Sequence, residues 1–286
     1  MQRAYLYYKN LSKRTRDSFQ IAVTSVGIIS TVMTVIGVSI GDWISSLWIS
    51  ILIVIFLILI VFIITYITIG RIFKDEVKIN IRQTSVCIMR GDIFKVSGWK
   101  VIGCDSHFDL RIDDTVISKK SVHGKFVMEH AKIVDLINTI HTEANRRKLH
   151  KDESGLYTFP LGTIIPYVSS IDNEKYLLLA TDNLNEQYEA RTNMEEYEQM
   201  LMKMWREIDR VYSMNDIVLP LLGTGLLRFE NGPKDKNTLL RCMLCTLNSS
   251  GISFNAKIKI IIYDETGNLN LYEYKDILSS VGRRDL

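Results

Sequence analysis

The stretch Asp216-Ile-Val-Leu-Pro-Leu-Leu-Gly-Thr-Gly-Leu-Leu-Arg-Phe229 decides how the rest of this chain is interpreted. Its first half, from Ile217 to Leu222, is a continuous apolar run, which is typical of a strand buried on both faces of a sheet. The run ends in Gly223-Thr224-Gly225, where the lack of bulky side chains lets backbone N–H groups approach a ligand closely. Open α/β sheets hold phosphorylated ligands in such loops, although a tight turn is the simpler interpretation of this motif alone.

Two long apolar segments precede this α/β part of the chain. Phe19 to Ile40 contains no charged residue, and as a helix it would span roughly 33 Å, enough to cross a hydrocarbon core of about 30 Å. After Gly41-Asp42-Trp43 the chain is again free of charge from Ile44 to Gly70. We expect a hairpin of two transmembrane helices over residues 19–70, at about 19–40 and 44–70, preceded by a basic segment at residues 1–18.

Two other interpretations of these segments are less consistent with the sequence. A signal peptide would have a shorter apolar region and a small-residue cleavage site. A buried helical hairpin of a soluble protein would show a polar face. Basic residues flank the outer ends of the two segments, and Asp42 is the only charge in the loop between them. We therefore expect a protein of the bacterial inner membrane with both termini on the cytoplasmic side.

Residues 75–286 predict a three-layer α/β/α domain with a mixed sheet covered on both faces, because strand and helix patterns alternate. A helix begins near Asn193, a residue suited to the N-cap. The predicted strands cover residues 77–81, 85–89, 100–104, 162–168, 176–180, 217–222 and 256–263, and the other predicted helices cover residues 128–148, 237–249 and 272–280.

Charge and cysteine content exclude some classes of function. The formal net charge is +3, and no basic patch interleaved with aromatic residues indicates a nucleic-acid partner. Cys242 and Cys245 have the spacing of a metal or redox motif, but no second Cys/His pair accompanies them. We expect them to be packed core thiols, and we predict no metal site and no cofactor.

Three loops follow apolar strands and should meet at one edge of the sheet. They lie around Asp92, between Asp105 and Phe126, and at residues 223–226. Asp92 can accept a hydrogen bond from an exocyclic amine, and Phe108 or Phe126 can cover a ring or a ribose. Ser121-Val122-His123-Gly124 and the glycine loop can offer backbone N–H groups to a diphosphate. Each residue taken singly has an ordinary structural interpretation.

Together these motifs resemble a macro domain, a fold that binds ADP-ribose. The resemblance covers about residues 75–286. It rests on Met89-Arg90-Gly91-Asp92-Ile93-Phe94 and on Leu219-Pro220-Leu221-Leu222-Gly223-Thr224-Gly225. It implies that Asp92 contacts adenine, that Gly223, Thr224 and Gly225 wrap the diphosphate and distal ribose, and that Val122, His123 and Gly124 also wrap the diphosphate.

The chain departs from the hydrolytic members of that family. They carry an Asn-Ala-Ala-Asn run after the third strand, where this chain has Val101-Ile-Gly-Cys-Asp-Ser-His-Phe-Asp109. The catalytic Asn is therefore missing. The departure argues against an enzyme and suggests a changed ligand.

Two spans fused to a divergent macro domain resemble the membrane effector of the type II Thoeris antiphage system. The resemblance implies that a TIR-domain enzyme consumes NAD and makes histidine-ADP-ribose, and that the macro domain binds this signal. It further implies homo-oligomerisation and membrane disruption that leads to abortive infection. Asp105, His107, Phe108 and Asp109 become candidates to recognise the part of the ligand that ADP-ribose lacks.

The predicted ligand-binding residues are Asp92, Ile93, Asp105, Ser106, His107, Phe108, Asp109, Ser121, Val122, His123, Gly124, Phe126, Leu222, Gly223, Thr224, Gly225 and Leu226. Two alternatives stay open. A membrane-tethered ADP-ribosyl hydrolase would use Asp105 or His123 as its base. A membrane anchor or scaffold would carry a vestigial pocket.

Overall fold

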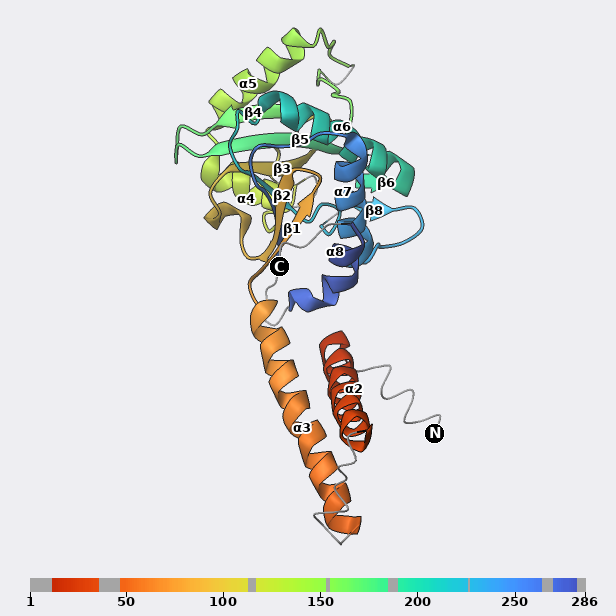
Figure 1. Cartoon of the computed structure of the whole chain (residues 1–286). Coiled ribbons are helices and arrows are strands. Elements are labelled where there is room, and N and C mark those ends of the chain that lie inside the picture. The colour runs from red at the N-terminus through yellow and green to blue at the C-terminus, as the bar shows by residue number, and fades with distance from the viewer. Residues whose placement is uncertain are drawn as a thin grey trace. The chain divides into compact units, whose positions relative to one another are not determined.

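The computed structural model divides the chain into two compact units, which are described separately (Figure 1). The first unit comprises Met1–Glu76 and Asn268–Lys275, and the second comprises Val77–Gly267 and Asp276–Leu286. The structure describes residues 12–35, 47–112, 117–152, 155–184, 190–225, 227–263 and 270–281. The predicted turn at Asp42, most of the basic segment 1–18, the ends of both predicted spans and Leu226 lie outside the described residues.

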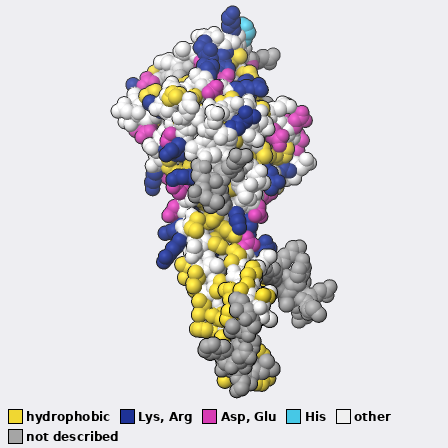
Figure 2. Space-filling view, in the orientation of Figure 1, with side chains coloured by type: hydrophobic (Ala, Val, Ile, Leu, Met, Phe, Trp, Pro, Cys, Tyr) yellow, Lys and Arg dark blue, Asp and Glu magenta, His cyan; other side chains and the backbone are white. Residues whose placement is uncertain are grey.

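Two apolar helices dominate the first unit. α2 (Lys13–Val35) and α3 (Leu47–Ile72) pack against each other. Both are long and apolar enough to cross a membrane. Figure 2 shows hydrophobic side chains gathered over these helices, and Leu52 and Phe56 of α3 are 64% and 60% exposed. The most apolar window of α3 contains no buried residue.

The N-terminal end of α2 and the C-terminal end of α3 are joined by polar and aromatic contacts within the first unit. The guanidinium of Arg14 lies 3.7 Å from the ring centroid of Tyr66 and donates to the Tyr66 carbonyl. The 3-10 helix η4 (Leu271–Tyr274) adds a third contact, because the Tyr272 hydroxyl donates to Asp17 at 2.8 Å. Tyr272 also packs edge-on against Phe73. These contacts bring the C-terminal segment to the base of the helix pair.

The second unit is built on a mixed nine-stranded sheet, which confirms the predicted α/β fold class with a mixed sheet. The strand order is β1-β2-β9-β7-β3-β5-β6-β8, and β4 pairs with β5. The run β2-β9-β7-β3-β5 is parallel throughout, whereas β4 and β6 are antiparallel to β5. The strands are β1 (Glu76–Ile81), β2 (Thr84–Arg90), β3 (Trp99–Asp105), β4 (Ile164–Val168), β5 (Lys175–Leu184), β6 (Ala190–Thr192), β7 (Ile217–Pro220), β8 (Arg228–Phe229) and β9 (Ile258–Ile262).

Both faces of the central strands are buried. Ile102 of β3 and Leu178 of β5 belong to one core cluster with Leu136 and Ile140 of α5 (Ile133–Arg146). Successive side chains of a strand point to opposite faces, so the intervening Val101, Leu177 and Leu179 point away from this cluster. They are also completely buried. The continuous apolar runs therefore reflect a sheet covered on both sides, as predicted.

The long helices begin and end at residues that suit those positions. Asn193 caps α6 (Met194–Val211) and forms a capping box with Glu196, which confirms the predicted N-cap. α7 (Lys236–Ser250) ends at Gly251, whose left-handed conformation suits glycine. The shorter elements are η2 (Ile93–Lys95), α4 (Val122–Lys125), the π-helix η3 (Phe126–His130) and α8 (Lys275–Val281).

Several predicted boundaries were wrong. The helix predicted at residues 128–148 is interrupted, because Ala131 is extended and the Lys132 N–H donates to the Tyr167 hydroxyl at 3.0 Å. α5 therefore begins only at Ile133. β5 continues to Leu184, and the short strands β6 and β8 were not predicted. Cys242 and Cys245 were expected to be packed core thiols. This expectation is wrong for Cys245, which is exposed, while Cys242 is half-buried.

Candidate functional site

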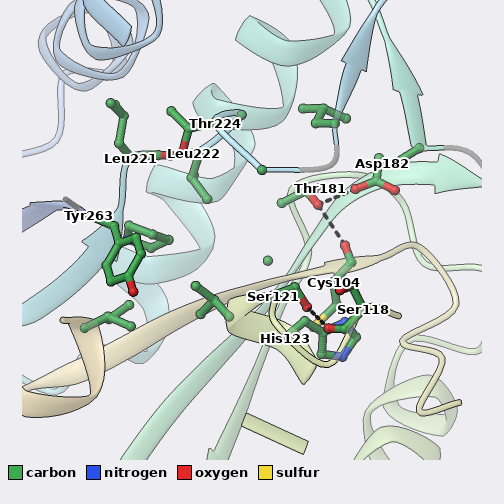
Figure 3. Close-up of a pocket in the computed structure, with 18 of the residues that line it drawn as sticks. Cys104, Ser118, Ser121, His123, Thr181, Asp182, Leu221, Leu222, Thr224 and Tyr263 are labelled. Atoms are coloured by element: carbon green, nitrogen blue, oxygen red, sulfur yellow. Dashed lines mark hydrogen bonds between the residues drawn. The ribbon is translucent and has the colours of Figure 1, made fainter. Parts of the chain in front are cut away.

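The carboxyl ends of five parallel strands open into one cavity of the second unit, called the pocket below. Its volume is about 840 Å³, within the range of roughly 300–1,000 Å³ that is common for small-molecule sites. In Figure 3, Tyr263, which follows β9, and Asp182 of β5 lie on opposite sides of the pocket. Leu222 and Thr224 lie between them above, and Ser121 and His123 below. The sheet thus gathers loops that are far apart in sequence.

Asp92 lies at the β2 end of the pocket. It caps η2, where its Oδ1 accepts a hydrogen bond of 3.1 Å from the Phe94 N–H. Phe94 also lines the pocket and stacks on the imidazole of His130, with ring centroids 4.5 Å apart. The cap fixes the direction of the carboxylate, and no partner of the second oxygen, Oδ2, is found among the described residues.

The glycine loop is shaped by two side-chain hydrogen bonds to its backbone. The Thr224 hydroxyl donates to the Leu221 carbonyl at 2.8 Å, and the Tyr197 hydroxyl donates to the Leu222 carbonyl at 3.0 Å. Gly223 has φ +84°, and a Cβ there would lie 3.1 Å from a methyl group of Leu239. Both its conformation and its surroundings therefore favour glycine.

A short helix, α4, forms the opposite wall of the pocket. Ser121 is its N-cap, since its hydroxyl oxygen accepts from the Gly124 N–H at 2.9 Å and its hydroxyl donates to the Ser118 carbonyl at 2.7 Å. A Cβ on Gly124 would lie 2.2 Å from that carbonyl oxygen, so only glycine fits. Burial lowers the pKa of His123 to about 4, and its imidazole is therefore neutral at pH 7.

Two carboxylates lie at the β5 end of the pocket. Asp105 and Asp182 are partners in the register of β3 and β5, after a bulge at Cys104/Asp105. Burial raises the pKa of Asp182 to about 6, and the nearby charge of Asp105 contributes to the rise. Burial also raises the pKa of Asp105, while the His107 N–H that donates to its carboxylate opposes the rise. The thiol of Cys104 stays protonated, because burial and the two carboxylates raise its pKa.

Basic side chains line other parts of the same pocket, namely Lys120, Lys125 and Arg228. The ammonium of Lys125 lies 5.9 Å from the ring centroid of Tyr263. The pocket therefore combines basic groups, backbone loops and a pair of carboxylates. No group of three or more potential metal ligands occurs within the part of the chain that the structure describes.

The structure brings most of the residues predicted from sequence to the pocket wall. Their contribution to ligand binding stays a prediction. The predicted residues that line the pocket are Asp92, Ile93, Asp105, Ser121, Val122, His123, Leu222, Gly223, Thr224 and Gly225.

Six predicted residues do not line the pocket. Phe108 and Phe126 belong to the hydrophobic core, so neither covers a ring or a ribose from this position. His107 turns toward the Tyr157 carbonyl at 3.2 Å, and Asp109 pairs with Arg111 at 2.6 Å. Ser106 is buried, and Gly124 packs against Ser118. The chain turns away from the pocket after Asp105, which explains why the 106–109 segment lies outside it.

Sequence reasoning missed Thr181, Asp182, Arg228 and Tyr263, which all line the pocket. Asp182 and Tyr263 come after the apolar runs Leu177–Ala180 and Ile260–Ile262. The rule that identified Asp92 and Asp105 applies to them equally, because both follow buried parallel strands. Arg228 lies on the unpredicted strand β8, and no comparable sequence signal marks it.

Comparison with protein families gives a match over most of the second unit. Residues 86–263 match the family model described as "Thoeris protein ThsA, Macro domain". Among curated proteins, the chain is similar to "Thoeris protein ThsA" of Bacillus amyloliquefaciens (strain Y2). The two are 26% identical over 213 residues, which cover 72% of this chain and 71% of that protein.

Solved structures with a similar backbone are macrodomains of Oceanobacillus iheyensis. The structure described as the macrodomain with ADP has a TM-score of 0.48 and 15% sequence identity, and the match covers 72% of this chain and 95% of that chain. The structure of the G37V mutant with ADPR has a TM-score of 0.49 and 15% identity, covering 72% and 97% of the two chains.

Proposed function

Because this chain belongs to the family of Thoeris ThsA macro-domain proteins, we propose that it is an antiphage-defence sensor that binds an ADP-ribose derivative in the pocket. The family model matches residues 86–263, and this range contains all of the residues that line the pocket. The proposal therefore concerns the part of the chain on which membership rests.

The observation that carries this proposal is the convergence of Asp92, residues Ser121–His123 and the glycine loop on one pocket. The strands that lead to it, from β2 to β5, are separated by four strand spacings, or about 19 Å at 4.8 Å each. A ligand with a base at one end and a sugar conjugate at the other suits this length. Glycine loops and basic groups along the middle suit a diphosphate.

The proposed signal is histidine-ADP-ribose, made from NAD by a TIR-domain partner enzyme. Asp105 supports this choice, because a buried carboxylate suits a histidyl amine or imidazolium better than a neutral ribose hydroxyl. Plain ADP-ribose would leave that end of the pocket without a charged partner.

The proposed response is homo-oligomerisation and disruption of the bacterial inner membrane, which ends in abortive infection. α2 and α3 support it, because both are long and apolar enough to span a bilayer. Both termini would be cytoplasmic, since the basic residues flank the outer ends of the two apolar segments. In this function the ligand is bound, not converted.

A membrane-tethered ADP-ribosyl hydrolase is the second candidate. Asp105 and Asp182 favour it, because carboxyl groups with raised pKa values inside a pocket are suited to general acid–base chemistry. Conversion of an ADP-ribosylated substrate by the purified full-length protein would support the hydrolase, and its absence under binding conditions would support the sensor.

The deciding experiment is calorimetric titration of the full-length protein in lipid nanodiscs with histidine-ADP-ribose and with ADP-ribose. Asp92→Ala and Gly223→Glu should abolish binding while the protein stays in the membrane fraction. Asp235→Ala is the matched control for Asp92→Ala. Asp235 is also a helix N-cap, at α7, and lies outside the pocket wall. Normal binding by both pocket variants would show that the site is misplaced.

A further inference from the structure

The β5 end of the pocket carries two carboxylates without a cationic partner. Asp105 and Asp182 are both 7% exposed and both line the pocket. Among the described residues, neither forms a salt bridge, whereas the nearby Asp109 is paired with Arg111. Taking an acid out of water without a compensating cation is costly. Two such acids side by side therefore need an explanation.

Hydrogen-bond counting indicates how the unliganded protein accommodates Asp182. The Thr181 hydroxyl oxygen lies 2.9 Å from the Cys104 carbonyl and 2.6 Å from Oδ2 of Asp182. A hydroxyl carries one hydrogen and can donate it to only one of these acceptors. If Asp182 is protonated, it donates to Thr181, and Thr181 donates to Cys104, so that both short contacts become hydrogen bonds. The geometry therefore fits a neutral Asp182.

The second oxygen of Asp182, Oδ1, has no hydrogen-bond donor among the described residues. Asp182 is buried and lines the pocket at its β5 end (Figure 3). Asp105 differs, because the N–H groups of His107 and Asp109 donate to its carboxylate. Backbone N–H groups thus donate to the carboxyl group of Asp105, whereas Asp182 has one oxygen without a donor among the described residues.

We propose that Asp182, with Asp105 beside it, is the specificity-determining residue that binds a cationic group of the ligand, an ammonium or an imidazolium. This inference rests on the proposed function, because it assigns one end of the ADP-ribose-binding pocket. A cation between the two acids would supply the missing charge, and charge-assisted hydrogen bonds are the strongest of their kind. A neutral conjugate would leave that end unpaired.

Cation binding also moves a proton. When the cation arrives, the Asp182 carboxyl ionises, its proton passes to the solvent buffer, and a cation–carboxylate pair remains. The titratable and charged groups of other elements that face the pocket enter this balance: Asp92, Cys104, Asp105, Lys120, His123, Lys125, Tyr197, Arg228 and Tyr263. His123 stays neutral near pH 7, because burial lowers its pKa to about 4.

The test compares three ligands with the full-length protein in nanodiscs: ADP-ribose, histidine-ADP-ribose, and a histidine conjugate whose amine is acetylated and whose imidazole is replaced by a neutral ring. Asp182→Asn keeps the shape of the side chain and removes its charge. We expect it to weaken binding of the cationic conjugate about tenfold more than it weakens binding of ADP-ribose. Asp216→Asn is the control, since Asp216 pairs with Lys259 at the opposite end of β7.

A second measurement needs no variant. Calorimetry in phosphate and in Tris, whose ionisation enthalpies differ, counts the protons released on binding. The unmodified protein should release more protons with the cationic conjugate than with ADP-ribose near pH 6. Equal release for the two ligands, or equal weakening of both by Asp182→Asn, would overturn this inference and leave the proposed function intact. Failure of every ADP-ribose compound to bind would overturn the proposed function and this inference together.

Discussion

The hydroxyl of Tyr197 donates a hydrogen bond of 3.0 Å to the carbonyl oxygen of Leu222, and this bond joins α6 to the glycine loop. Both residues are buried. The loop that faces the ligand is therefore held from behind by a helix whose own position is set by its capping box and its apolar face. Pocket shape and fold stability are linked at this contact.

Tyr197→Phe should weaken both properties. The change leaves the buried Leu222 carbonyl without its donor, at a cost of about 1–2 kcal/mol. We expect a lower midpoint of thermal unfolding and about fivefold weaker ligand binding, measured by calorimetry. Tyr212→Phe is the control. Tyr212 caps the same helix, and among the described residues its hydroxyl contacts only Met214 Sδ, at 3.4 Å. Unchanged affinity of Tyr197→Phe would show that the bond does not shape the loop.

A comparison of Gly223→Ala with Gly232→Ala separates the effect of backbone strain on stability from the effect of the glycine loop on ligand binding. Gly223 and Gly232 have φ values of +84° and +80°, so an alanine at either position costs about 1–2 kcal/mol. Only the Gly223 Cβ would crowd Leu239, and only Gly223 lines the pocket.

We expect both glycine variants to lose thermal stability and only Gly223→Ala to lose ligand affinity, as measured by differential scanning fluorimetry and calorimetry. A parallel loss of affinity in Gly232→Ala would mean that binding follows global stability, and the glycine loop would then have no special role.

Asp182→Asn should stabilise the protein at neutral pH. The folded-state pKa of Asp182 is about 6, above the ordinary carboxyl value of 3.8, so the folded protein binds its proton more tightly than the unfolded chain does. The free energy of unfolding therefore falls as pH rises from about 4 through 6, by about 2–3 kcal/mol from this group. An asparagine amide can donate to Thr181 as the protonated acid does, without this loss.

Thermal unfolding at pH 4 and pH 8 checks that expectation. The stabilising effect of Asp182→Asn should be present at pH 8 and absent at pH 4. Asp109→Asn is a control of opposite sign: although burial opposes it, hydrogen bonds from Arg111 lower the pKa of Asp109. Its folded state favours ionisation, so its replacement should destabilise the protein above the unfolded pKa and lose that effect in acid. The same sign for both variants would contradict the assigned states.

The native thiols provide a test of membrane orientation. Cys87 and Cys104 are buried, Cys242 is half-buried and Cys245 is exposed. If the second unit is cytoplasmic, a membrane-impermeant maleimide should label Cys245 only after cells are permeabilised. Cys245→Ser should remove most of the signal. Labelling of intact cells would contradict the predicted topology.

The parallel sheet explains which parts of the fold and of the site were accessible from sequence. Apolar runs such as Ile217–Leu222 predicted buried strands, and Asn193 and Gly251 marked helix ends, because local chemistry dominates at these positions. The convergence of Asp92 with the glycine loop followed from the rule that parallel strands end at one edge.

Features that depend on tertiary contacts could not be predicted. The late start of α5 depends on the Tyr167 hydroxyl, which lies 35 positions further along the chain from Lys132. A phenylalanine can stack on a ligand or pack in the core, and only the tertiary packing decides between the two roles. Phe108 and Phe126 are in the core. Residues Ser106–Asp109 were predicted to line the pocket, but the chain turns away from the pocket after the bulge in β3.

The return of residues 268–275 to the first unit means that the peptide chain passes between the two units three times, after positions 76, 267 and 275. A fragment that begins at residue 75 would lose Asp17 and Phe73, the hydrogen-bond and packing partners of Tyr272. It would also uncover part of Tyr272, which is 2% exposed in the intact protein. A fragment truncated at the apparent domain boundary would therefore expose an apolar surface that is covered in the intact protein. Poor solubility of that fragment would then result from the truncation, and it would not show that the domain is misfolded.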